Sequence, residues 1–547
     1  MKKSSAAVIG LFLLLYILPL GVRPIIIPDE TRYAEIPREM LASEDWVVPH
    51  LNGLRYFEKP VLGYWLNAVS IMLFGENAFA VRFPSAMATG ISALLLFIFV
   101  RRFAGGHSIG ILAAAAFLTC LEVLGVGTFS VLDSLLSMFI TGAMIFFFFA
   151  YMEEELLRRT VFLVLFGAFC GFSFLIKGFI AFAVPAVAIL PFMIWEQKWK
   201  ELFRVCWIPI VAAVMVALPW SVMIHLRDPD FWRYFFWVEH IKRFMSGHPQ
   251  HPHPFWYFIP VLIGGALPWT ALFPVAISGV AETRFKDSLV RFAVCWFLFP
   301  FLFFSASHGK LATYILPCFQ PLAIVIAVGL MRYLEAGKRR GFNIGALSLA
   351  MITAILAIIL VASQVSDFPG FRVYGPKETW KWAFGVVGLL MWALLSVLAA
   401  RSAGSRQKLI IYCAAPLLFM FSAHFIMPDQ SLAKKAPGKF LLRHADKVLP
   451  DTILVSDEGM VRAVCWFSKR DDVFLLNSTG ELEYGLGYDD SKRRLLTFEQ
   501  FKELVGMSNR EKRVVLIAKT KHYAQYRTLF PKPVFKDIDG GFVFAEF

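Results

Sequence analysis

Residues 28–60 read PDETRYAEIPREMLASEDWVVPHLNGLRYFEKP, a densely charged segment in an otherwise apolar chain. The segment follows an apolar run from Ser5 to Val22, and the sequence beyond it is mostly apolar as far as about Met427. It is longer than the connection that usually joins two neighbouring elements. A chain that only spans a bilayer does not need such a connection. We therefore expect residues 28–60 to be the functional part of a membrane enzyme.

The composition is that of an integral membrane protein. Of 547 residues, 58% are hydrophobic and 17% are charged, whereas about a quarter of the residues are charged in a soluble domain. The net charge of +14 does not indicate nucleic acid, because Lys and Arg in short cytoplasmic loops orient the spans and also attract membrane lipids. The seven cysteines show neither metal-binding spacing nor a disulfide framework.

Apolar windows of about 20 residues can cross a bilayer core. The sequence predicts thirteen spans, near 5–22, 79–100, 107–126, 131–150, 160–176, 179–195, 205–225, 255–277, 291–306, 311–331, 342–362, 382–400 and 408–427. The two windows within 160–195 could also form one broken span. Lys and Arg fall in the loops of one side, which is therefore the cytoplasmic side together with the N-terminus. Residues 28–60, the loop near 226–254 and the C-terminal tail are then outside.

The composition changes near Pro428. Short strand-like runs, among them RDDVFLLN, KRVVLIAK and GGFVFAEF, alternate with the helical pattern LTFEQFKELVGM. We expect a polytopic all-α membrane domain in residues 1–427, with interfacial helices in its first outer loop, and a small soluble α/β domain in residues 428–547.

Charged pairs begin and end the first outer loop. Asp29 and Glu30 directly follow the first span, where adjacent carboxylates can bind a divalent ion, orient a sugar hydroxyl or act as a base. The alternative is a solvated helix cap. A solvated helix face is the interpretation that we favour for the other acids of the loop, Glu35, Glu39, Glu44 and Asp45. Glu58 and Lys59 end the loop. They could form an ordinary surface ion pair, or they could serve the function, because charges beside a membrane-lying helix are otherwise costly to desolvate.

Further polar residues lie at the same outer face. Asp133 lies at the mouth of the fourth predicted span, where an acid is rare and indicates function. Lys177 also lies at an outer end, although its side chain could simply snorkel to the interface. Lys310 and Tyr314 begin the tenth predicted span.

The outer loop RDPDFWRYFFWVEHIKRFMSGHPQHPHPFWYF, residues 227–258, is rich in His and aromatic residues. Its histidines suit a metal site, a phosphate site or a solvated loop. Glu58 and His240 could share one metal ion with water completing the coordination. Cations beside a bilayer mouth suit phosphate head groups. Together these charges favour an enzyme that acts on lipid phosphates.

Several motifs carry a family resemblance. Residues 28–65 and the motifs VLDSLL, LIKGFIAFAVP, FWRYFFWVEHIKRF, HPFWYFIPVLIGGALPW and GKLATYILPCF resemble the bacterial aminoarabinose lipid A transferases, and more broadly the protein O-mannosyltransferases of the GT-C membrane fold. The resemblance implies transfer of 4-amino-4-deoxy-L-arabinose from undecaprenyl phosphate to a phosphate of lipid A, outside the inner membrane. Such a product carries less negative charge, which implies resistance to polymyxin and other cationic antimicrobial peptides.

The resemblance also implies roles for individual residues. The family's acids map onto Asp29 and Asp133 as catalytic residues. Its ligands for a divalent metal, zinc or another, map onto Glu58 and His240, with His251 as the rival. The implied phosphate contacts are Lys59, Lys177, Arg243 and Lys310. The implied sugar or head-group contacts are Tyr33, Tyr56 and Tyr314.

An acceptor phosphate simplifies the expected chemistry. Its second pKa is near 6, so it is an anionic nucleophile at neutral pH and needs no strong general base. The leaving phosphate needs stabilisation by cations. We therefore expect Asp29 to orient the donor sugar or its amine, and direct displacement to invert the anomeric centre.

Three other functions remain open. One is transfer of a lipid-linked sugar to protein or another glycan. Another is transport of a lipid or sugar, although the sequence shows neither the inverted repeats nor the midplane charges typical of transporters. The third is a scaffold or sensor, which would not require Asp29, Asp133 and Lys177 at the membrane mouth.

Overall fold

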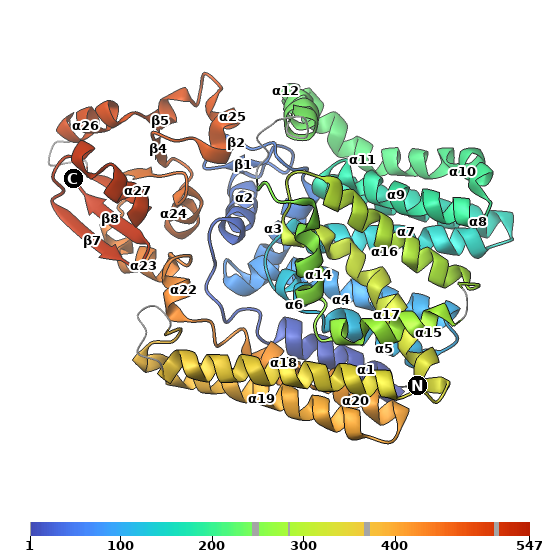
Figure 1. Ribbon diagram of the computed structural model, residues 1–547. Coiled ribbons are helices and arrows are strands. Elements are labelled where there is room, and N and C mark those ends of the chain that lie inside the picture. Colours follow the sequence, from blue (N-terminus) through green and yellow to red (C-terminus); the bar gives the residue numbers. More distant parts are fainter. Residues whose placement is uncertain (1, 243–250, 283–284, 366–371, 508–512) are drawn as a thin grey trace. The chain divides into compact units, whose positions relative to one another are not determined.

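The computed structural model describes residues 2–242, 251–282, 285–365, 372–507 and 513–547, and helices dominate it (Figure 1). The chain forms two compact units. The first comprises Met1–Leu20, Phe83–Arg372 and Trp380–Ile426, and the second comprises Gly21–Arg82, Val373–Thr379 and Met427–Phe547. The charged first loop therefore belongs to the same unit as the C-terminal tail. The last segment of this unit begins at Met427, whereas the sequence prediction divided the chain between residues 427 and 428 and kept the first loop with the membrane domain.

The first unit consists of helices, because a backbone in lipid must satisfy its hydrogen bonds internally. They are α1 (Lys2–Phe12), η1 (Leu13–Ile17), α4 (Ala78–Phe103), α5 (His107–Leu118), α6 (Leu121–Gly127), α7 (Leu132–Met152), α8 (Leu156–Lys177), α9 (Ile180–Trp195), α10 (Trp199–Val205), α11 (Trp207–Arg227), α12 (Asp230–Trp232), η2 (Arg233–Lys242), η3 (Phe255–Tyr257), α14 (Phe258–Gly265), η4 (Trp269–Leu272), α15 (Phe273–Ala281), α16 (Ser288–Ala306), η5 (Ala312–Cys318), α17 (Phe319–Glu335), α18 (Arg340–Val365), α19 (Thr379–Arg401), α20 (Ser405–Ala414) and α21 (Leu417–Ser422). Helix α4 begins in the second unit.

The chain is a multi-span membrane protein. Within the described ranges, eight helices are long and apolar enough to cross a bilayer, or up to ten if two bent helix pairs each count as one span. The bent pairs are α5–α6, at 65°, and residues 255–281, at 94°. Of the thirteen predicted spans, those near 5–22, 179–195 and 408–427 coincide with shorter helices.

Small residues let the membrane helices approach closely. A Cβ atom on Gly167 of α8 would lie 2.2 Å from the carbonyl oxygen of Pro209 in α11. A Cβ on Gly279 of α15 would lie 2.0 Å from the carbonyl oxygen of Gly329 in α17. Since the hydrophobic effect does not drive association in lipid, such backbone contacts are an important source of helix packing.

The second unit begins with a helical hairpin around a short β-turn. Helix α2 (Asp29–Ser43) continues through Pro37. Strands β1 (His50–Leu51) and β2 (Leu54–Arg55) pair antiparallel across a turn in which Asn52 and Gly53 both have positive φ, the geometry of a type I′ turn. Helix α3 (Leu62–Phe74) is apolar but too short to be counted as a span.

A six-stranded sheet forms the centre of the C-terminal part. Its strands lie in the order β5 (Leu495–Leu496), β4 (Phe474–Leu476), β3 (Ile453–Ser456), β6 (Val514–Lys519), β8 (Phe542–Glu546) and β7 (Phe535–Asp539). The first four are parallel, and β8 and β7 are antiparallel to their neighbours. The chain moves outward from β3 to β5 and returns to the other side of β3 as β6, so the strand order reverses between β3 and β6.

Helices surround this sheet and complete the predicted α/β pattern. They are α22 (Asp429–Ala433), α23 (Gly438–Arg443), η7 (Ala445–Lys447), α24 (Val461–Ser468), η8 (Gly480–Leu482), α25 (Glu483–Leu486), η9 (Lys492–Arg494), α26 (Phe498–Met507), α27 (Thr520–Gln525) and η10 (Arg527–Leu529), and the second unit also contains η6 (Pro376–Glu378). The core beneath them includes the buried residues Val455, Phe501, Leu516, Val543 and Ala545.

Candidate active site

The two adjacent acids at the start of α2 have different surroundings. The side chain of Asp29 is 41% exposed and lies 3.3 Å from Arg32. Glu30 is fully buried, accepts hydrogen bonds of 2.6 and 2.7 Å from Arg82, and accepts a third from the amide of Ile26. A buried carboxylate with this many donors is fully used by the fold. Of the pair, Asp29 is therefore the acid that can meet a substrate.

Glu481 connects the first loop to the sheet part of the same unit. Its carboxylate forms ion pairs with Arg32 and, at 3.0 Å, with Arg462. Burial raises the pKa of Glu481, but Arg32 and Arg462 together outweigh burial and hold its pKa below the ordinary value. Glu481 is consequently a fixed anion that orients Arg32 beside Asp29.

The Tyr56 hydroxyl lies between two carboxylates. Its oxygen is 2.9 Å from Oε2 of Glu58 and 3.3 Å from Oε2 of Glu481. Burial raises the pKa of Tyr56 well above its ordinary value, in spite of the opposing effect of Arg32. The hydroxyl therefore keeps its single proton, and the shorter contact makes Glu58 the preferred acceptor. The ammonium of Lys59 donates to the carbonyl oxygen of Glu58 at 2.8 Å.

Two tyrosines stack beside Arg32. The rings of Tyr33 and Tyr64 lie 6.2 Å apart, and the guanidinium of Arg32 lies 5.7 Å from the ring centroid of Tyr33. The hydroxyl of Tyr64 is buried and has no hydrogen-bond partner in the described part of the chain. An unsatisfied buried hydroxyl requires an explanation, and a polar substrate group would provide one.

A second cluster lies within the first unit, called the membrane unit below because it contains the candidate membrane spans. Asp133, in the first turn of α7, forms a 2.7 Å ion pair with Lys177 at the end of α8. The ammonium of Lys177 is 4.9 Å from the ring centroid of Tyr314 in η5. Three residues that the sequence predicted separately are thus in contact. Lys310 lies close to Tyr314 in the sequence and is buried. Its ammonium donates to the carbonyl oxygens of His253 and Ser307.

Two predicted site residues cannot be placed. Arg243 lies outside the described residues, and the structure describes the backbone but not the side chain of His240. His251 is exposed, and its carbonyl oxygen accepts from the amide of Lys310 at 3.1 Å. Among the described residues there is no group of three or more His, Cys, Asp or Glu that could hold a metal ion.

Sequence reasoning misjudged the second half of α2. Glu35 and Glu39, interpreted from the sequence as a solvated helix face, are 0% and 3% exposed. Glu35 forms a bidentate pair with Arg38, and Glu39 accepts from the amides of Asn52 and Gly53. Burial raises the pKa of both acids. Glu39 therefore holds the turn between β1 and β2, and Glu35 is held by Arg38, rather than facing solvent.

Sequence reasoning also missed four members of the cluster: Arg32, Tyr64, Arg462 and Glu481. Arg32 carried a local signal, since it lies three residues from Asp29 and such pairs share a helix face. Glu481 lies 449 residues from Arg32, and no local pattern indicated that they would meet.

Comparison with known proteins places this chain in a family. The chain is 39% identical over 521 residues to the undecaprenyl phosphate-α-4-amino-4-deoxy-L-arabinose arabinosyl transferase of Aeromonas salmonicida, covering 95% of this chain and 94% of that protein. It is 41% identical to the protein of the same name from Shewanella sediminis, covering 90% of each. The chain belongs to this family of arabinosyl transferases.

Two family models match separate parts of this arabinosyl transferase. Residues 5–235 match the dolichyl-phosphate-mannose-protein mannosyltransferase model, and residues 432–546 match the model of the arabinosyl transferase ArnT C-terminal domain. The crystal structure of ArnT from Cupriavidus metallidurans bound to undecaprenyl phosphate has a TM-score of 0.82 to this chain at 22% identity, covering 99% of this chain and 97% of that one. That likeness shows a shared fold. The chain is therefore a glycosyltransferase with the ArnT fold.

Proposed function

We propose that this enzyme transfers 4-amino-4-deoxy-L-arabinose from undecaprenyl phosphate to a phosphate of lipid A, at the periplasmic face of the bacterial inner membrane. The observation that carries the proposal is 39% identity over 95% of the chain to a protein named for that donor. The modified lipid A would carry less negative charge, and the cell would resist polymyxin and other cationic peptides.

The chemistry needs a positioned donor more than a strong base. The acceptor phosphate is already an anion at neutral pH, and its oxygen attacks the anomeric carbon while the bond to undecaprenyl phosphate breaks. The exposed carboxylate of Asp29 can bind the sugar amine through a charge-assisted hydrogen bond. Arg32 holds Asp29 in place, because Glu481 fixes the guanidinium from its other side.

The cluster in the membrane unit suits the phosphate side of the reaction. A Lys held by a carboxylate and an aromatic ring is oriented before substrate arrives. We propose that Lys177, held by Asp133 and Tyr314, stabilises the charge on a phosphate. Lys59, Lys310 and Arg243 remain proposed phosphate contacts, and Tyr33 and Tyr56 remain proposed contacts of the sugar or head group.

A divalent metal, zinc or another, remains a proposal on Glu58 with His240, or with His251 in its place. Within the described ranges the surrounding residues do not make a complete metal site, and Glu58 already accepts a hydrogen bond from Tyr56. A bound metal would supply positive charge for a leaving phosphate. No step of the proposed reaction requires it.

Thirteen spans are part of the same proposal. With the N-terminus in the cytoplasm, this number leaves the first loop and a soluble C-terminal domain in the periplasm. Single cysteines introduced at Glu44 and at Arg401 test the topology by labelling intact spheroplasts with a membrane-impermeant maleimide. Labelling at residue 44 alone supports the proposal, and labelling at residue 401 alone contradicts it.

The proposed reaction is tested by mass spectrometry of lipid A. A strain that lacks this chain should lack the added aminopentose, and expression of the chain should restore it. If the strain that expresses the chain under inducing conditions contained only unmodified lipid A, the proposal would be contradicted.

A protein or glycan acceptor is a second candidate, favoured by the match of residues 5–235 to the protein mannosyltransferase model. Membrane vesicles supplied with a labelled lipid-linked donor separate the two candidates. Label in the lipid A fraction supports the leading proposal, whereas label in the protein fraction supports the second.

A further inference from the structure

A pocket in the C-terminal α/β part borders the cluster described above, because the carbonyl oxygen of its lining residue Glu458 accepts a 3.1 Å hydrogen bond from Arg462. It has a volume of about 180 Å³ and is bordered by residues that follow three parallel strands: Asp457 after β3, Asn477 and Ser478 after β4, and His522 after β6. The strand order reverses between β3 and β6. The crevice at such a reversal, outside the carboxyl ends of the strands, is where open α/β sheets bind their ligands.

One wall of the pocket contains an unsatisfied carboxylate. Oδ2 of Asp457 accepts from the amide of Lys519 and pairs with Nδ1 of His522, each at 2.8 Å. Oδ1 of the same residue is buried and has no hydrogen-bond partner in the described part of the chain. Asp457 as a whole is only 6% exposed. A buried carboxylate oxygen without a donor is costly, so a cation bound in the pocket beside Asp457 would stabilise this carboxyl group electrostatically.

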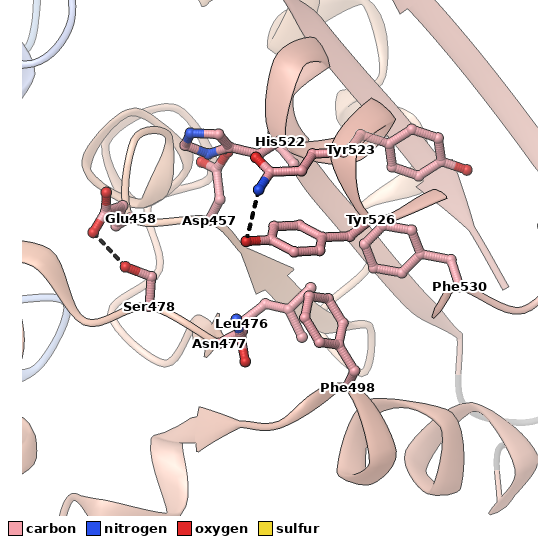
Figure 2. A pocket seen from close by; sticks show the side chains of 12 residues that line it. Asp457, Glu458, Leu476, Asn477, Ser478, Phe498, His522, Tyr523, Tyr526 and Phe530 are labelled. Atoms are coloured by element: carbon pink, nitrogen blue, oxygen red, sulfur yellow. Dashed lines mark hydrogen bonds and ion pairs between the residues drawn. The ribbon is translucent and has the colours of Figure 1, made fainter. Parts of the chain in front are cut away.

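The neighbouring Glu458 adds a second acceptor. Its Oε2 accepts a 2.6 Å hydrogen bond from the hydroxyl of Ser478, and Figure 2 shows this pair beside Asp457 at one side of the pocket. The described residues that line the pocket include two carboxylates and neither Lys nor Arg. This charge pattern disfavours a phosphate or any other anion as the ligand.

Aromatic rings form the opposite wall (Figure 2). The rings of Phe498 and Tyr526 lie 4.9 Å apart, and those of Tyr523 and Phe530 stack at 5.0 Å with an interplanar angle of 7°. Aromatic faces attract cations and pack against flat apolar surfaces. A ligand that suits both walls has an apolar face, a positive group and hydroxyls.

The volume limits the size of the ligand. A cavity of about 150 Å³ holds one benzene ring, so this pocket accepts a single six-membered ring with few substituents. We propose that it binds one amino monosaccharide, with the ammonium beside the carboxyl groups of Asp457 and Glu458, hydroxyls on Glu458 and Asn477, and the ring face on the aromatic wall. The choice of aminoarabinose among amino sugars rests on the proposed function, whereas the pocket does not.

Photo-crosslinking of the full-length protein in detergent tests this proposal. The probe is a methyl 4-amino-4-deoxy-L-arabinoside that carries a diazirine, and methyl L-arabinoside with the same diazirine is the neutral comparison. Mass spectrometry of peptides locates the label. We expect the amino probe to label residues 498–530, and unlabelled methyl 4-amino-4-deoxy-L-arabinoside to compete with this labelling. The neutral probe should label these residues roughly tenfold less, because it cannot form the charge-assisted bond.

Variants then connect the label to the pocket. We expect Asp457→Asn to reduce labelling of residues 498–530 about tenfold, while Asp489→Asn, at a 97% exposed side chain, leaves it unchanged. Tyr526→Leu removes part of the aromatic wall without touching Asp457, and should also reduce labelling. Thermal unfolding of each variant shows that it remains folded.

Several outcomes would overturn the proposal: equal labelling by both probes, unchanged labelling in folded Asp457→Asn and Tyr526→Leu, or label confined to residues outside the pocket. Competition by donor lipid or by modified lipid A identifies which molecule presents the sugar, and either result supports the pocket. Transfer by the unaltered enzyme is measured separately in vesicles, so a failure of the proposed reaction and a failure of the pocket give different results.

Discussion

The two halves of helix α2 carry similar charges but use them differently. In the first half, the side chain of Asp29 is 41% exposed and, among the described residues, its ion-pair partner is Arg32. In the second half, Glu35 and Glu39 are buried and bound to Arg38 and to two backbone amides. The difference shows that charge density alone does not identify an active site. What distinguishes Asp29, the acid that we propose for the reaction, is its capacity to accept a further hydrogen bond.

The largest effect should come from a charge that is fully used by the fold. Arg82→Met removes the guanidinium that pairs with Glu30 and leaves this carboxylate buried, because both side chains are 0% exposed. We expect a loss of about 3–5 kcal/mol in the free energy of unfolding, measured by chemical denaturation in detergent. Arg158→Met, at an exposed ion pair with Glu155, is the matched control and should change stability little. Equal stability of the two variants would show that the Glu30–Arg82 pair is not structural.

The next effect should concern activity rather than stability. Asp29→Asn keeps the shape of the side chain but removes the charge that we propose positions the sugar amine, so transfer should fall about a hundredfold. The measurement is transfer of label to lipid A in vesicles. Glu44→Gln, at an exposed position just after the same helix, should retain normal transfer. A comparable loss in both variants would point to a general effect of negative charge.

Glu39→Gln should reverse that pattern. A Gln side chain turns an amide group toward the amides of Asn52 and Gly53, and we expect a loss of about 1–3 kcal/mol in the free energy of unfolding. Transfer per folded molecule should be near normal. A large loss of transfer in stable Glu39→Gln protein would show that both halves of α2 serve the reaction.

The smallest effect should appear in the pH dependence of stability. The pKa of Glu481 is lowered in the folded state, so its stabilising contribution is present above the ordinary Glu value and disappears as the pH falls through the lower folded value. The stability difference between the unaltered enzyme and Glu481→Gln should therefore be largest near neutral pH and shrink in acid. A difference that grew as the pH fell would contradict the assigned charge of Glu481.

Local patterns predicted the helices and strands, because apolar length and strand alternation are local properties of the sequence. The contact of Asp133 with Lys177 was consistent with their common position at the outer ends of two neighbouring predicted spans. Glu481 could not be found in this way, because its contact with Arg32 arises only when the C-terminal part folds onto the first loop. The burial of Glu39 was hidden for the same reason, since its donors lie in a turn beyond the helix.

The separation of roles along α2 can be tested by the transfer rate per folded molecule for Asp29→Asn and Glu39→Gln, measured side by side in vesicles with lipid A as acceptor. The folded fraction of each is taken from its unfolding curve. We expect Asp29→Asn to be folded like the unaltered enzyme and to transfer about a hundredfold more slowly, while folded Glu39→Gln transfers at a near-normal rate. Near-normal transfer by folded Asp29→Asn would contradict the assignment of Asp29 to the reaction.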